Sequence, residues 1–133
     1  MVQTLSYADT DAFSVLLTDY IAQKPALAPF YNRWPSLENF AAQIEEKKAS
    51  YTPQARKRLV AALRDQYGFA PDPEPAIEAS LLLLAEPTTF TVTTGHQLNL
   101  LTGPLYFIYK IVTAIKLSRQ LKETYPQYDF VPV

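Results

Sequence analysis

Residues 89–117, TFTVTTGHQLNLLTGPLYFIYKIVTAIKL, are the stretch that decides the fold. The apolar and β-branched run at 90–94 predicts a buried strand. The triplet at 102–104 predicts a helix start, with Gly103 as N-cap and Pro104 at the first helical position. A strand, a glycine-punctuated loop and a helix N-terminus bring free backbone donors and a positive dipole end to one place. We therefore expect an anion-binding crevice beside this loop.

The helix that follows is predicted from Pro104 to about Thr124, where Tyr-Pro at 125–126 ends it. Polar side chains recur along one side of it at spacings of three and four residues. The final segment, YDFVPV, predicts a second strand. Strand, crossover helix and strand make a right-handed parallel βαβ unit. The apolar side of the helix is predicted to comprise Leu105, Ile108, Ile111, Val112, Ile115 and Leu121.

The chain upstream of this unit is predicted to be mainly helical. Helices are expected at 10–23, capped by Thr10 or Asp11, at 36–48, capped by Ser36, and at 53–67, opened by Thr52-Pro53. An aromatic segment around Trp34 predicts a short helical turn that fills a gap in the core. The run Arg56-Lys57-Arg58 is interpreted as a solvated face.

These patterns define an α/β fold in which a mostly helical N-terminal part precedes the first βαβ unit of a Rossmann-like parallel sheet. We predict a helical region over 1–70, a proline-rich connector with a short apolar helix over 71–87, and the βαβ unit over 88–133. Two parallel strands cannot cover their own faces and edges. The chain is therefore interpreted as a truncated front piece of a longer protein, and a self-associating homo-oligomer is expected.

Composition narrows the class of protein. The net charge of −1 and the near-neutral balance of charges argue against nucleic-acid binding and against a polybasic membrane patch. The sequence contains no run of 18 apolar residues, so no membrane span is predicted. The absence of cysteine excludes disulfides and thiolate metal sites and fits a cytoplasmic protein, and a single histidine makes a zinc site untenable.

The candidate ligand-binding residues surround the central loop. Lys110 lies six residues past Pro104, about 9 Å along the helix axis, and its side chain leans back toward the N-terminus. His96 is interpreted either as a group that binds an anion or transfers protons, or as a loop residue bonded to a carbonyl. No nucleophile–base pair is evident, so no catalytic residue is assigned. The substrate- or phosphate-binding candidates are Gly95, His96, Gln97, Thr102, Gly103, Tyr106 and Lys110.

The run TGHQLNLLTGPLYFIYKIVTAIKL at 94–117, followed by a strand ending in VPV, resembles the start of the bacillithiol biosynthesis cysteine-adding enzyme family, called BshC. The usual segment of that family is G-Q-Q-x-G-L-x-T-G-P-L-Y-x-I-x-K, and the resemblance extends over the whole chain. Two positions depart from it: His96 replaces a glutamine, and Asn99 replaces a glycine. Because the family segment has glutamine at this position, the resemblance implies that His96 is a binding residue rather than an indispensable acid or base.

The resemblance implies a Rossmann-like core related to class I nucleotidyltransferases and aminoacyl-tRNA synthetases, and a coiled coil for dimerisation. It implies a ligase that joins cysteine to glucosaminyl-malate through a new amide, with ATP and Mg as the suggested source of activation. The candidate residues above, with Pro104, would line the ligand crevice, and the fragment alone would be inactive. The alternatives are a non-catalytic helical assembly module and a nucleotide- or phosphate-binding domain of another class.

Overall fold

The computed structural model describes residues 3–68, 75–95, 99–101 and 103–133. The chain divides into two compact units, Met1–Asn39 and Phe40–Val133, and each is described by itself. The connector prolines Pro71 and Pro73 lie outside the described residues, as do His96, Gln97 and Thr102 of the predicted site.

The first unit holds short helices. Its main helix begins later than predicted, because the Ser14 hydroxyl accepts a hydrogen bond from the Leu17 N–H at 3.3 Å. Asp11, predicted as a cap, has a left-handed φ of 51° and instead ends the preceding 3₁₀ turn. The elements are η1 (Ala8–Thr10), α1 (Val15–Ile21) and η2 (Pro25–Phe30).

An aromatic cluster holds the end of this unit together. Trp34 is half-buried, and its ring centroid lies 4.9 Å from that of Tyr20 and 6.3 Å from that of Tyr31. The Asn39 side-chain amide donates to the Trp34 carbonyl at 2.9 Å. The prediction that Trp34 packs within this aromatic segment is confirmed.

Three helices open the second unit: α2 (Asn39–Ser50), whose first residue belongs to the first unit, α3 (Pro53–Tyr67) and α4 (Pro75–Ala85). The predicted start of α3 is confirmed, since the Thr52 hydroxyl accepts from the Ala55 N–H at 3.2 Å. The predicted start of α2 at Ser36 is wrong, because a turn occupies residues 37–38.

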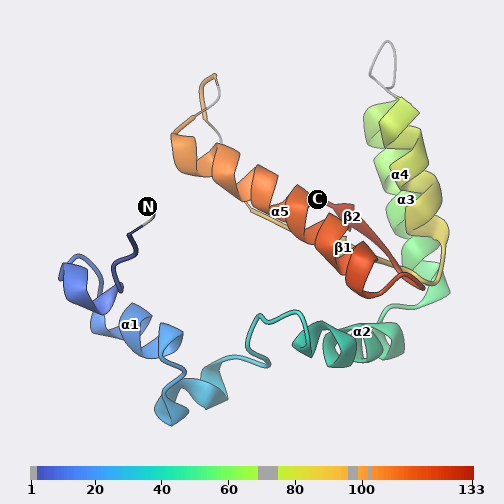
Figure 1. The fold of residues 1–133 in the computed structure, drawn as a ribbon. Coiled ribbons are helices and arrows are strands. Elements are labelled where there is room, and N and C mark those ends of the chain that lie inside the picture. Colours follow the sequence, from blue (N-terminus) through green and yellow to red (C-terminus); the bar gives the residue numbers. More distant parts are fainter. Residues whose placement is uncertain (1–2, 69–74, 96–98, 102) are drawn as a thin grey trace. The chain divides into compact units, whose positions relative to one another are not determined.

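A parallel two-stranded sheet forms the centre of this unit (Figure 1). Strand β1 (Thr89–Val92) pairs with β2 (Asp129–Pro132), with Thr89 opposite Asp129 and Val92 opposite Pro132. Helix α5 (Leu105–Thr124) connects the two strands and packs against both, as does α4. The predicted mostly helical chain with a parallel βαβ unit is confirmed.

The apolar core lies where α3 and α4 meet β2. Its buried members are Val60, Leu81, Leu84 and Val131, and the Leu121 side chain of α5 is completely buried. The predicted apolar side of α5 is wrong for its first half: Leu105, Ile108, Ile111 and Val112 are exposed. The buried residues of α5 lie from its middle onward and are Ala114, Ser118 and Leu121. No helix among the described residues is both long and apolar enough to cross a membrane.

Candidate functional site at the carboxyl end of β1

Of the predicted site residues that the structure describes, Gly95, Tyr106 and Lys110 lie near the carboxyl end of β1. Gly95 follows the strand, and its carbonyl accepts a hydrogen bond from the Lys110 ammonium. The contact exists because a helical side chain leans toward the N-terminus, so Lys110 reaches back over the first turns of α5. Lys110 therefore places a positive charge beside the loop that leaves the strand.

The turn into α5 depends on Gly103. Its φ of +64° is left-handed, and a Cβ at this position would lie 2.8 Å from the Asn99 Cβ and Cγ atoms. The prediction of Gly103 as N-cap is wrong: Pro104, with φ −73° and ψ 154°, is the N-cap, and α5 begins at Leu105. The extended residue before a helix is its cap, and Gly103 is used for the tight turn one residue earlier. Pro104 gives the first turn of α5 no side-chain cap.

Tyr106 lies in the first turn of α5 with 56% of its surface exposed. The Lys110 Nζ lies 5.8 Å from the centroid of its ring, within the range of a cation–π interaction. The structure thus brings together Gly95, Tyr106 and Lys110, and Gly103 shapes the turn that leads into the same helix. An ammonium group, an exposed phenol and an uncapped helix N-terminus are suited to binding a carboxylate or phosphate.

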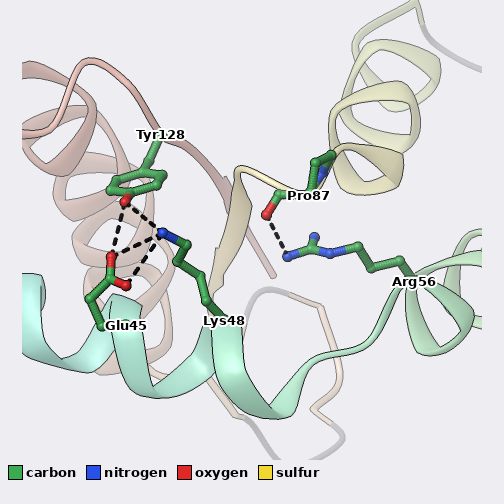
Figure 2. Close-up of polar contacts among 5 residues, drawn as sticks. All are labelled: Glu45, Lys48, Arg56, Pro87 and Tyr128. Atoms are coloured by element: carbon green, nitrogen blue, oxygen red, sulfur yellow. Dashed lines mark hydrogen bonds and ion pairs between the residues drawn. The ribbon is translucent and has the colours of Figure 1, made fainter.

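The opposite end of β1 is held by Arg56, whose burial was not predicted from the sequence. Its side chain is buried and donates to the carbonyls of Thr89 at 2.7 Å, Leu84 at 3.4 Å and Pro87 at 3.2 Å. Figure 2 shows the guanidinium of Arg56 directed at Pro87. Its Cζ also lies 4.7 Å from the centroid of the Tyr51 ring.

The interpretation of this basic run as a solvated face is therefore wrong for Arg56. A signal was present in the helical spacing, because Arg56 lies four residues before Val60 and seven before Leu63, on the apolar side of α3. Burial lowers the pKa of Arg56, and the nearby Tyr51 acts in the opposite direction. A guanidinium keeps its charge at neutral pH even so.

A second polar cluster joins α2 to the residue before β2 (Figure 2). The Lys48 ammonium donates to the Glu45 carboxylate at 3.0 Å and to the Tyr128 hydroxyl at 3.2 Å. The Tyr128 hydroxyl donates to the same carboxylate at 3.1 Å. These hydrogen bonds, that from Lys48 above all, lower the pKa of Glu45, and the bond to Glu45 raises the pKa of Lys48. The cluster is exposed and holds two elements together.

Within the part of the chain that the structure describes, no group of three or more His, Cys, Asp or Glu side chains could hold a metal ion. The Lys110 ammonium at the carboxyl end of β1 is chemically suited to binding and orienting an anionic group.

The sequence profile of the family described as "Bacillithiol biosynthesis BshC, N-terminal Rossmann-like domain" matches residues 1–133. A protein of Christiangramia forsetii named "Putative cysteine ligase BshC" is 50% identical over 129 residues, which are 97% of this chain and 24% of that protein. Proteins with the same name from Flavobacterium psychrophilum and Cytophaga hutchinsonii are 49% and 39% identical, over 97% and 99% of this chain and 24% and 25% of theirs. The chain spans about a quarter of the length of these relatives. No solved structure gives a significant match.

Proposed function

The chain belongs to the family of bacillithiol biosynthesis BshC N-terminal Rossmann-like domains, and we propose that it is the N-terminal part of a cytoplasmic ligase that joins cysteine to glucosaminyl-malate. The observation that carries the proposal is the family match over the full chain, together with the name that its relatives bear. The chain itself would supply part of a binding site and would be inactive alone.

We assign the binding of an anionic substrate group to the carboxyl end of β1. Open α/β sheets bind ligands outside the carboxyl ends of their strands, which is where Lys110 meets the Gly95 carbonyl. Glucosaminyl-malate carries carboxylates, and a carboxylate would exchange the Lys110–carbonyl contact for a charge-assisted hydrogen bond. Tyr106 lies one helical turn before Lys110 on α5 and is exposed. Gly95, Gly103, Tyr106 and Lys110, with His96, Gln97 and Thr102 of the same loop, are the proposed binding residues.

Formation of an amide from a carboxylate requires activation, and ATP with Mg is the group that the resemblance suggests. Among the described residues, the Lys110 ammonium could bind one anionic oxygen of a nucleotide. No group of three or more acidic side chains in the described part of the chain could bind Mg. We therefore assign no metal ligand to this chain and route no step through the nucleotide.

The test uses the full-length protein that carries this domain. Incubated with cysteine, glucosaminyl-malate and ATP, it should yield bacillithiol, detected by mass spectrometry. No product under any nucleotide condition, together with no calorimetric binding of glucosaminyl-malate, would refute the proposed activity.

The role of Lys110 is tested separately by Lys110→Ala. Loss of a charge-assisted hydrogen bond should weaken the binding of glucosaminyl-malate by about 10-fold or more. The matched control is Lys116→Ala, which removes an exposed ammonium from the same helix and should leave the affinity unchanged. Equal affinities of the two variants would show that Lys110 does not bind glucosaminyl-malate. That result would not bear on the proposed ligase activity.

A further inference from the structure

The ammonium group of Lys110 lies between two groups that attract a cation. It donates a hydrogen bond to the Gly95 carbonyl, and its Nζ lies 5.8 Å from the centroid of the Tyr106 ring. A carbonyl oxygen accepts hydrogen bonds through its lone pairs, and the face of an aromatic ring attracts positive charge. The carbonyl and the ring therefore define a cation-binding position, which the side chain of Lys110 itself occupies. We name this the amine position.

Lys110 lies there without an acidic partner. Among the residues that the structure describes, it makes no ion pair, and it is half-buried. A carboxylate attracts an ammonium group more strongly than an uncharged carbonyl does. Because the lysine side chain is flexible, it can turn toward such a group. A bound carboxylate would then leave the amine position open beside it.

A ligand that carries both a carboxylate and an amine matches this arrangement. Its carboxylate would bind Lys110, and its amine would donate to the Gly95 carbonyl and face the Tyr106 ring. A phosphate ion matches less well, because it presents negative oxygens in every direction and would be repelled by the carbonyl oxygen and by the face of the ring. The geometry therefore favours an amino-carboxylate over a phosphate group.

We propose that the amine of glucosaminyl-malate occupies the amine position, between the Gly95 carbonyl and the Tyr106 ring, while Lys110 binds a carboxylate of the malate half. The inference rests on the proposed function, which supplies the substrate. In glucosaminyl-malate only a few bonds separate the amine from the nearer malate carboxylate, so one molecule can reach both groups. The amine is also the group that becomes the nitrogen of the new amide.

Cysteine also carries an amine and a carboxylate, but the reaction uses them differently. Its carboxyl group becomes the carbonyl of the new amide, so it has to be activated and attacked rather than held by Lys110. The malate carboxylates are unchanged by the reaction and suit a lasting ion pair with a lysine. A carbonyl oxygen is too weak a base to remove a proton, so Gly95 orients the amine through a hydrogen bond.

The test compares the binding of two ligands to the full-length protein by calorimetry. One is glucosaminyl-malate, and the other is 2-deoxyglucosyl-malate, in which a hydrogen replaces the amine. The native protein should bind the deaminated ligand about 10-fold more weakly, because the hydrogen bond to the carbonyl and the contact with the ring are lost. Tyr106→Leu should weaken the binding of glucosaminyl-malate by about 3-fold and leave that of the deaminated ligand unchanged.

Two further variants separate the ring from other effects of the substitution. Tyr106→Phe keeps the ring and should bind both ligands as the native protein does. Tyr109→Leu is the matched control, because Tyr109 is an exposed tyrosine of the same helix, and it should leave both affinities unchanged. Since Tyr106 is itself exposed, its replacement should not change the urea midpoint of the protein.

Equal affinities of the native protein for the two ligands would overturn the proposal, as would a Tyr106→Leu effect that is the same for both. Displacement of glucosaminyl-malate by cysteine would assign the amine position to cysteine and would also overturn it. These three results leave the proposed ligase activity standing. A native protein that binds neither ligand and makes no bacillithiol would instead refute the proposed function and this proposal together.

Discussion

The two ends of β1 differ in how their polar groups are used. At the amino end, the guanidinium of Arg56 is buried and hydrogen-bonded to three backbone carbonyls. At the carboxyl end, Lys110 makes one contact with the Gly95 carbonyl, and Tyr106 is 56% exposed. The guanidinium at the amino end makes its hydrogen bonds within the fold, while the groups at the carboxyl end remain accessible. The difference separates a residue that holds the architecture together from residues that are suited to a ligand.

The comparison is tested most strongly by Arg56→Met. Methionine fills the space of the side chain but leaves the buried carbonyls of Leu84 and Thr89, and the part-buried carbonyl of Pro87, without this donor, so the free energy of unfolding should fall by about 3 kcal/mol or more. The matched control is Arg58→Met on the same helix, where the side chain is exposed, and its effect should stay within about 0.5 kcal/mol. Urea denaturation of the 133-residue chain measures both. Equal and small effects would mean that the Arg56 contacts contribute little.

The turn at the carboxyl end is tested by Gly103→Ala. Alanine in the left-handed region costs roughly 1–2 kcal/mol, and its Cβ would also displace the Asn99 side chain. The control is Gly95→Ala, because a Cβ at Gly95 meets nothing within 4 Å and should change the stability by less than about 0.5 kcal/mol. The same urea titration applies. A Gly103→Ala protein as stable as the Gly95→Ala protein would show that the turn tolerates another conformation.

The order and type of the elements in the second unit could be predicted from local sequence signals. Thr52-Pro53 is a cap followed by a proline, and the β-branched run at 90–94 followed by a glycine loop predicts strand and turn. These signals act within a few residues, and the structure places α3 and β1 at those positions. The proximity of Gly95, Tyr106 and Lys110 could be predicted for the same reason, since these residues lie within one strand–loop–helix unit.

What could not be predicted depends on residues far apart in the sequence. The three carbonyls that Arg56 contacts lie 28 to 33 residues away, so the helical spacing places Arg56 on the apolar side of α3 but does not indicate which groups its guanidinium contacts. The buried side of α5 was misjudged for a related reason. Helical periodicity identifies an apolar stripe along a helix but does not indicate which part of the stripe packs against another element. In α5 the first half of the stripe is exposed, whereas Leu121 is fully buried.

The smallest effect is expected at the exposed cluster of Glu45, Lys48 and Tyr128, through Tyr128→Phe. Phenylalanine keeps the ring beside Phe90, 5.6 Å away in the native protein, and loses only the hydroxyl that Glu45 and Lys48 share. The pKa of Glu45 lies below its ordinary value of 4.5, so its contribution is present above that pH and is lost as the pH falls through the folded pKa. The pKa of Lys48 lies above 10.5, so its contribution is present below that pH and is lost only as the pH rises through the folded pKa. Between these limits the cluster should give no pH dependence.

Urea midpoints of the native chain and of Tyr128→Phe, compared at neutral pH and at about pH 3, measure the difference. The native chain should lose slightly more of its stability on acidification, because the Tyr128 hydroxyl is one of the groups that depress the pKa of Glu45. Glu45→Gln is the control, since it has no carboxylate to protonate and should lose least. Parallel losses in all three proteins would show that the cluster does not contribute to the folded state in solution. The buried hydrogen bond from Arg56 of α3 to the Thr89 carbonyl of β1 would then contribute to stability where the exposed cluster does not.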